Sequence, residues 1–183
     1  MSAEGQGSRR LLPPERLQPR HALSAFANGR HPALDEWLRD RAAASEGLSA
    51  RTYVVCTAAS PDRVIAYHAI STAMVGRGAL PSAKLRRAMP DQVPMLLIGR
   101  LAVDASFQGI GLGSDLLADA VRRCVAAAAH AGARGILTHA IDDAAAAFYR
   151  RHGFVPSPLG ELVLMMPIET ARMLCTPAGP SDI

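Results

Sequence analysis

The chain has 183 residues, of which 49% are hydrophobic and 20% charged. This length suits one domain with a sizeable core, and the composition excludes an intrinsically disordered protein. No apolar stretch is long enough to span a bilayer, and the polar start lacks the apolar core of a signal peptide. The three cysteines lack metal-ligand or CxxC spacing. We therefore expect reduced thiols, no metal, no membrane contact and a cytoplasmic location.

The net charge is +4 at pH 7, and its excess lies early in the chain. Residues 1–103 carry 14 Lys and Arg against 8 Asp and Glu, whereas residues 104–183 carry 6 against 8. A basic half indicates an anionic partner, and a mildly basic solvated surface is the alternative interpretation.

Hydrophobic periodicity and turn residues predict one mixed α/β domain over residues 13–170, between a disordered tail (1–12) and a C-terminal tail (171–183). The predicted elements of the first half are a helix over 32–41, a hairpin of strands over 51–57 and 64–72, and a short helix over 82–88 within a basic loop. Those of the second half are a central strand over 95–103, a long helix over 112–131, a strand over 135–140, a helix from Asp142 or Asp143 to Gly153, and strands over 154–155 and 161–168. Gly132 is predicted to cap the long helix. This order favours one sheet with helices on both faces.

A glycine-rich run, Gln108-Gly109-Ile110-Gly111-Leu112-Gly113, lies between the central strand and the long helix. Glycines permit positive φ angles, and a helix N-terminus offers unpaired N–H groups, so the run predicts a phosphate or pyrophosphate site. The Walker pattern fails because no Gly-Lys-Ser/Thr follows, and the Rossmann GxGxxG fails because position 114 is Ser114. Glycines at a helix start that serve packing alone are the alternative.

Tyr149 shares a helix face with Ala145 and Asp142, whereas Phe148 points about 100° away. We therefore expect Phe148 to fill the core and Tyr149 to face a cleft, in which the small Ala145 leaves room for a slender ligand. A half-buried packing tyrosine is the alternative interpretation.

With these features, residues 15–168 resemble the GNAT N-acetyltransferases. The resemblance implies a mixed, mostly antiparallel sheet and acetyl-CoA as the acetyl donor, with no metal. It assigns the pantetheine arm and acetyl carbonyl to Leu101, Ala102 and Val103, and the departing thiolate to Tyr149 as general acid. It further implies cofactor contacts from Gln108, Gly109, Gly111, Leu112, Gly113, Ser114, Asp142 and Ala145. Many members carry Asn where this chain has Asp142.

A narrower resemblance is to the GNAT toxins of bacterial toxin–antitoxin pairs. The residues that carry it are Phe26-Ala27-Asn28-Gly29, Ala33-Leu34-Asp35-Glu36-Trp37-Leu38, Thr52-Tyr53-Val54-Val55, Leu85-Arg86-Arg87-Ala88-Met89-Pro90-Asp91 and Gly99-Arg100-Leu101-Ala102-Val103-Asp104. Relatives often have Cys-Gly or similar where this chain has Ala27-Asn28-Gly29. The resemblance implies acetylation of the α-amino group of aminoacyl-tRNA, a block of translation, a homodimer, and a ribbon-helix-helix antitoxin through which the toxin reaches operator DNA.

The residues fit that chemistry in two respects. By the resemblance, the Val103 N–H is expected to stabilise the tetrahedral oxyanion, and Met95–Val103 contains no carboxylate base. An aminoacyl ester has an α-amine pKa below the roughly 7.7–8.0 of a chain terminus, so it needs a base less than a lysine does.

The basic segment 77–100 predicts tRNA phosphate contacts by Arg77, Lys84, Arg86, Arg87 and Arg100. The alternatives are a GNAT enzyme for a small amine or a protein amino group, and a non-catalytic co-repressor that acts on DNA with an antitoxin.

Overall fold

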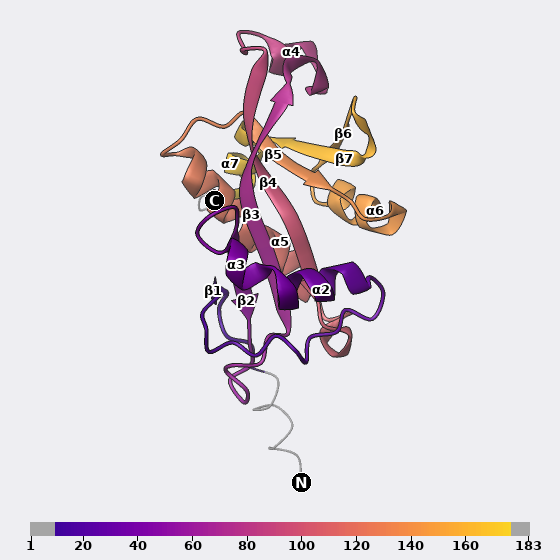
Figure 1. Ribbon diagram of the computed structural model, residues 1–183. Coiled ribbons are helices and arrows are strands. Elements are labelled where there is room, and N and C mark those ends of the chain that lie inside the picture. Colours follow the sequence, from indigo (N-terminus) through magenta and orange to yellow (C-terminus); the bar gives the residue numbers. More distant parts are fainter. Residues whose placement is uncertain (1–9, 177–183) are drawn as a thin grey trace, which may run out of the picture. The chain divides into compact units, whose positions relative to one another are not determined.

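The computed structural model describes residues 10–176. Seven strands form one mixed, mostly antiparallel sheet in the order β1-β2-β3-β4-β5-β7-β6, in which β4 and β5 are parallel (Figure 1). The strands are β1 (Glu15–Arg16), β2 (Arg51–Val55), β3 (Ala66–Gly76), β4 (Gln92–Val103), β5 (Gly135–His139), β6 (Val155–Ser157) and β7 (Gly160–Pro167). The helices are α2 (Pro32–Asp40), α3 (Ala42–Ser45), α4 (Ala83–Arg86), α5 (Leu112–Ala128), α6 (Asp143–Arg151) and α7 (Ile168–Cys175), with 3₁₀ turns η1 (Arg77–Ala79) and η2 (Ala105–Phe107).

The described chain divides into two compact units. The first comprises residues up to Ser71 together with Gly99–Asp119, and the second comprises Thr72–Ile98 and the residues from Ala120 onward. Strands β3 and β4 are long enough to contribute to both units.

The first unit has helices on both faces of its strands. Neighbouring residues on each strand alternate between two clusters, as the pleat of a strand requires. Ala102 packs with Val54, Tyr67 and Leu38 of α2, whereas Val103 packs with Leu112 and Leu116 of α5. The last two residues of β4 therefore contact opposite layers.

The second unit has a core of Val75, Val93, Met95, Leu137 and Met165. Its helix α7 lies where the sequence predicted the start of a tail at residue 171, and Ala171 is fully buried. At the other end, residues 10–12 of the predicted N-terminal tail are paired: Leu12 N donates to Cys56 O, and Ala58 N donates to Arg10 O. The remainder of both predicted tails lies outside the described residues.

Two local predictions about helix ends have opposite outcomes. Helix α5 ends at Ala128, and Gly132 lacks the positive φ of a helix-capping glycine, so the predicted cap is wrong. Helix α6 ends as predicted, because Gly153 has φ +89° and the N–H groups of Gly153 and Phe154 bond to Arg150 O and Tyr149 O. The predicted hairpin is confirmed by the antiparallel pairing of β2 with β3. Within residues 10–176, no helix is both long and apolar enough to cross a membrane.

Candidate active site

The glycine loop connects η2 to α5 in the first unit. Gly109 and Gly111 have φ angles of +78° and +87°, which L side chains rarely adopt. A Cβ built on either would meet no heavy atom within 4 Å. Backbone conformation, rather than crowding, therefore requires glycine here. The loop is open to solvent from Gln108 to Gly111.

The amide groups of this loop are unsatisfied. Within residues 10–176, the N–H groups of residues 109–113 have no hydrogen-bond acceptor. The next two N–H groups, of Ser114 and Asp115, both donate to Gly111 O, at 3.0 and 3.2 Å. Five consecutive free donors thus precede or begin a helix of 17 residues, whose N-terminus carries partial positive charge. This arrangement is suited to bind an anion.

The Gln108 side chain holds the loop to its surroundings. Its Nε2 donates to Asn28 O at 2.9 Å and to Val103 O at 3.0 Å. The buried Asn28 contributes a second bond to Val103 O, from Nδ2 at 3.4 Å, and its Oδ1 accepts the N–H of His31 at 3.0 Å, just before α2. In this structure Gln108 is therefore a tether between the end of β4 and the segment before α2.

Asp104 anchors the residues between β4 and the glycine loop. Its carboxylate accepts the N–H of Ser106 at 3.0 Å, the N–H of Ala27 at 3.2 Å and a bond from the Ser106 hydroxyl. Burial opposes its ionisation, but these hydrogen bonds and Arg63, at 3.9 Å, hold the pKa of Asp104 below its ordinary value. Sequence reasoning missed Asp104 and Asn28; the Asp-x-Ser turn signal at 104–106 could have indicated the former.

Among the residues assigned to the acetyl group, Ala102 and Val103 are buried and Leu101 is half-buried. Arg100, one residue earlier, is exposed, and its Cζ lies 5.5 Å from the centroid of the Trp37 ring. No ion pair within residues 10–176 holds Arg100.

Tyr149 lies on α6, in the second unit. Asp142 is the N-cap of helix α6, and its Oδ1 accepts the Ala145 N–H at 2.7 Å. Tyr149 is 7% exposed, and it is Phe148 that is only half-buried. The prediction that Phe148 fills the core is therefore wrong, and access of Tyr149 to a cleft stays a prediction.

The reason lies in the row that leads to Phe148. Ile141 and Ala144 on that row are both exposed, and the Phe148 ring packs against His152 with centroids 4.6 Å apart. Burial raises the pKa of Tyr149, and a hydrogen bond with the Thr138 side chain opposes part of that increase.

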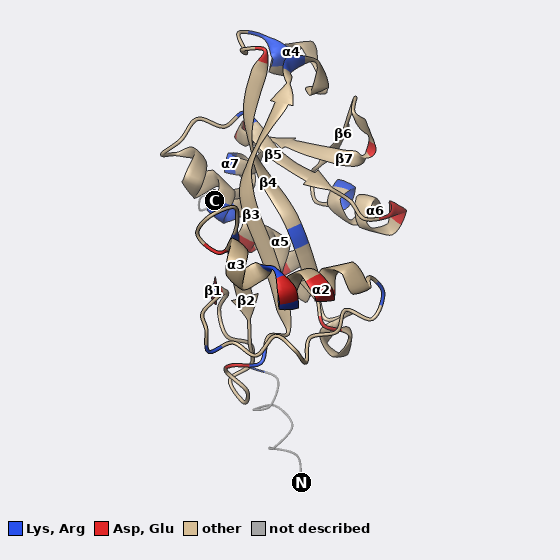
Figure 2. Cartoon of the chain, in the orientation of Figure 1, with Lys and Arg blue, Asp and Glu red and all other residues tan. Residues whose placement is uncertain are grey.

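The predicted tRNA contacts of the second unit differ in availability. Lys and Arg gather on α4 and the turns beside it (Figure 2). Lys84 and Arg87 are exposed. Arg77 pairs with Asp91 at 2.9 Å, and the half-buried Arg86 donates to Leu80 O at 3.0 Å. Arg86 therefore stabilises this turn, and Lys84 and Arg87 remain available for an anionic ligand.

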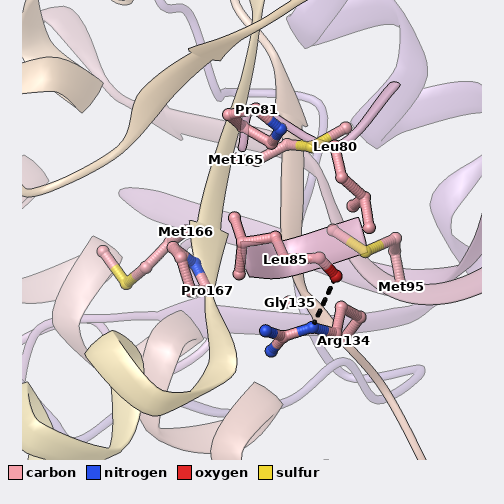
Figure 3. A pocket seen from close by; sticks show the side chains of 9 residues that line it. All are labelled: Leu80, Pro81, Leu85, Met95, Arg134, Gly135, Met165, Met166 and Pro167. Atoms are coloured by element: carbon pink, nitrogen blue, oxygen red, sulfur yellow. Dashed lines mark hydrogen bonds between the residues drawn. The ribbon is translucent and has the colours of Figure 1, made fainter. Parts of the chain in front are cut away.

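A small cavity in the second unit offers no cofactor site. Figure 3 shows it between α4 and β7, and its volume is about 10 Å³, the lower limit for one water molecule. Arg134 lines it; its Nε donates to Leu85 O and its Nη1 to both carboxylate oxygens of Glu169, at 2.7 and 2.8 Å. Within the described chain, no group of three or more His, Cys, Asp or Glu residues could hold a metal ion.

Comparison with known proteins agrees with this geometry. A family model described as the acetyltransferase (GNAT) domain matches residues 51–156, more than half of the chain. The chain therefore belongs to the GNAT acetyltransferase family.

Within that family, this chain is similar to a curated toxin and to solved structures of AtaT and KacT. A tRNA-acetylating toxin of Mycobacterium tuberculosis (strain ATCC 25618 / H37Rv) is 43% identical over 163 residues, which are 88% of this chain and 95% of the relative. The structure of AtaT complexed with acetyl-methionyl-tRNAfMet has a TM-score of 0.82 at 28% identity, over 91% of this chain and 99% of that one. A tyrosine-to-phenylalanine mutant of KacT has a TM-score of 0.83 at 27% identity, with the same coverage. The chain thus lies in the toxin branch of the family.

Proposed function

We propose that this protein transfers the acetyl group of acetyl-CoA to the α-amino group of aminoacyl-tRNA and so blocks translation. The observation that carries the proposal is the run of five unsatisfied N–H groups over residues 109–113, on an exposed loop at the start of α5. The 43% identity to a tRNA-acetylating toxin supports the choice of acceptor.

Acetyl-CoA fits this loop because its pyrophosphate needs several N–H donors and no side chain near the backbone. The N–H groups of residues 109–113 have no acceptor within residues 10–176, and nothing lies within 4 Å of a Cβ built at Gly109 or Gly111. We assign the pyrophosphate to the N–H groups of Gly109, Gly111, Leu112 and Gly113, with Ser114 beside them. A structure of AtaTR bound with AcCoA, 29% identical to this chain, supports the choice of cofactor.

The end of β4 would hold the thioester. In this proposal Leu101 and Ala102 bind the pantetheine arm through their backbone, and the Val103 N–H stabilises the oxyanion that forms when the amine attacks the carbonyl carbon. The Gln108 and Asn28 side chains both bond to Val103 O, in the peptide that follows the one with the Val103 N–H, and so hold this end of β4 in place before the substrates arrive. Preorganised donors of this kind need no rearrangement during the reaction.

Tyr149 is our proposed general acid, which protonates the thiolate as the C–S bond breaks. Burial raises its pKa, so its phenol is protonated at neutral pH, the form that an acid must have. By comparison, the Tyr67 hydroxyl is committed to Leu34 O at 2.7 Å. The resemblance assigns Asp142 and Ala145 to the cofactor. In the structure Asp142 is the N-cap of α6 and accepts the Ala145 N–H, and contact of either residue with acetyl-CoA stays a prediction.

For the tRNA we propose phosphate contacts by Lys84 and Arg87, supported by their exposure, with Arg77 as a further contact and Arg86 as a support of the same turn. An α-amine is also the acceptor that needs least help from a base.

We further propose a homodimer, a cytoplasmic location, a ribbon-helix-helix antitoxin and access to operator DNA through that antitoxin. Structures of AtaT bound to the C-terminus of the antitoxin AtaR and of a KacTA–DNA complex support the last two.

The test is mass spectrometry of charged tRNA after reaction with acetyl-CoA and the purified protein. We expect one acetyl group on the amino acid of the charged tRNA and none on uncharged tRNA. Acetylation of free amines or protein lysines in place of charged tRNA would favour the broader GNAT activity. Growth arrest that persists with Tyr149→Phe would favour a non-catalytic co-repressor.

A further inference from the structure

Arg100 differs from the other basic residues because an aromatic ring holds its guanidinium group. It lies on β4 one residue before the proposed acetyl-binding segment, and its Cζ is 5.5 Å from the centroid of the Trp37 ring on α2. Its Nη1 also donates to the carbonyl of Gly99 at 2.6 Å. Two contacts thus fix the orientation of an exposed side chain that would otherwise be free to rotate.

The ring under Arg100 is itself rigidly supported. Trp37 stacks on Tyr67 with centroids 5.9 Å apart and an interplanar angle of 11°. Tyr67 is fully buried, donates its hydroxyl hydrogen to Leu34 O and meets Phe26 edge-on at 5.4 Å. The column runs from the core of the first unit to the surface, and the guanidinium group of Arg100 is its outermost layer.

The charge of Arg100 is not neutralised within the described chain. Several other arginines of the same unit have carboxylate partners; Arg16, for example, pairs with Glu46 at 2.7 Å, and Arg39 with Asp40 at 2.9 Å. Arg100 has no such partner within residues 10–176. A planar cation that is positioned, exposed and unpaired is a suitable surface on which an unpaired nucleobase can stack.

We propose that the Arg100–Trp37 pair is a stacking platform for the terminal nucleobase of the aminoacyl-tRNA. Stacking there positions the α-amino group of the attached aminoacyl ester for attack on the thioester carbonyl of acetyl-CoA. This inference rests on the proposed function. It replaces a simple phosphate contact at Arg100 with recognition of a base, since the guanidinium group offers a flat face held in one orientation. Lys84 and Arg87 remain phosphate contacts.

The experiment compares three acceptors in steady-state kinetics: a charged tRNA, the corresponding aminoacyl-adenosine, which has the base without phosphate, and the amino-acid methyl ester, which has neither. Arg100→Lys keeps the charge but removes the plane. We expect KM to rise about tenfold for both the charged tRNA and the aminoacyl-adenosine, with little change for the methyl ester. Arg39→Lys, on the same face of the sheet and paired with Asp40, is the matched control and should change none of the three.

The outcomes separate the two proposals. One outcome would overturn the platform and make Arg100 a phosphate contact. In that outcome Arg100→Lys leaves the KM for aminoacyl-adenosine unchanged, and Arg100→Gln raises KM only for the charged tRNA, in a salt-dependent way. Equal effects on all three acceptors would indicate a general structural role and would also overturn it. If the wild-type protein acetylates no aminoacyl substrate, the proposed function fails as well. Acetyl-CoA affinity and thermal unfolding of each variant show whether its fold is kept.

Discussion

The helices α5 and α6 begin in opposite ways. At the start of α6 the Asp142 carboxylate accepts the Ala145 N–H at 2.7 Å, so the helix is capped by its own chain. At the start of α5 five N–H groups, from residue 109 to residue 113, have no acceptor within residues 10–176. Both helix starts were assigned to the cofactor by resemblance, but only one is electrostatically open to an anion.

The difference shows how a loop can be ordered and still keep its donors free. Asp142 orders the start of α6 by using an amide group of that helix. The loop before α5 is ordered from upstream, by Asp104 and by Gln108, whose bonds go to Ala27, Ser106, Asn28 and Val103. The amide groups of the glycine loop therefore remain available, and the predictions below test this division of roles.

The largest loss of activity should come from α6, through the Tyr149 side chain and not through the N-terminus of the helix. Tyr149→Phe should lower kcat by at least about 100-fold, because a general acid contributes about that much, and should leave acetyl-CoA affinity nearly unchanged. Single-turnover acetylation of charged tRNA measures it. Tyr67→Phe is the control, since it removes a hydroxyl bonded to Leu34 O and should affect stability more than kcat. Equal losses of kcat in both variants would contradict the role of Tyr149.

The pH profile gives a second view of Tyr149. Because burial raises its pKa above the ordinary value of 10.0, the phenol stays protonated, and active as an acid, up to at least that pH. We therefore expect that ionisation of Tyr149 does not lower kcat below about pH 10. Any fall of kcat at lower pH should be the same in the wild type and in Tyr149→Phe. A fall near neutral pH that Tyr149→Phe abolishes would mean that the phenol ionises there, against its burial.

The open helix start should be sensitive to its backbone. Gly111→Ala places a side chain at φ +87°, at a cost of about 1–2 kcal/mol, and the loop should relax by turning its amide groups away. We expect the Kd of acetyl-CoA to rise about tenfold in calorimetric titrations. Gly132→Ala, which has no atom within 4 Å of the new Cβ and no positive φ, should bind as the wild type does.

Asp104 should show the upstream anchoring as pH-dependent stability. Its pKa is below the ordinary 3.8, so its ionised form stabilises the fold above that pH, and this contribution is lost as pH falls through the lowered pKa. Asp104→Asn should reduce the free energy of unfolding by about 1–3 kcal/mol at pH 7. In urea unfolding the difference from wild type should shrink below about pH 4. A difference that is the same at pH 7 and pH 3 would contradict this role.

The smallest effect should come from the cap itself. Asp142→Ala should destabilise the protein by about 1 kcal/mol, as loss of an N-cap does, and Asp142→Asn should be nearly silent because Asn also caps helices. Neither variant should change the acetyl-CoA affinity of the folded protein. A tenfold weaker affinity in Asp142→Ala at full folding would show that both helix starts bind the cofactor, which would break the comparison.

Local signals predicted much of this fold. The turn residues between β2 and β3, the apolar run of β4 and the Gly153 end of α6 are encoded within a few residues and were predicted correctly. The cap of α6 was narrowed to Asp142 or Asp143, of which the structure has Asp142. The glycine loop was predicted for the same reason, since its φ angles depend on the residues that occupy it.

Features set by distant residues were missed. The burial of each side chain on α6 depends on its neighbours in the second unit, so Phe148 was wrongly predicted to fill the core. Helix α7 starts directly after β7 with no polar N-cap side chain, and its signal was weak. The network of Asn28, Gln108 and Asp104 joins residues about 80 positions apart, as in the Gln108 bond to Asn28, and no sequence spacing indicates such pairing.

The most direct test of the open helix start is to titrate the wild-type protein and Gly111→Ala with acetyl-CoA and with S-acetylpantetheine, which lacks the pyrophosphate. If the amide groups of residues 109–113 bind the pyrophosphate, the wild type should prefer acetyl-CoA strongly, and Gly111→Ala should lose most of that preference while its affinity for S-acetylpantetheine stays the same. Equal affinity of the wild-type protein for the two ligands would contradict the account.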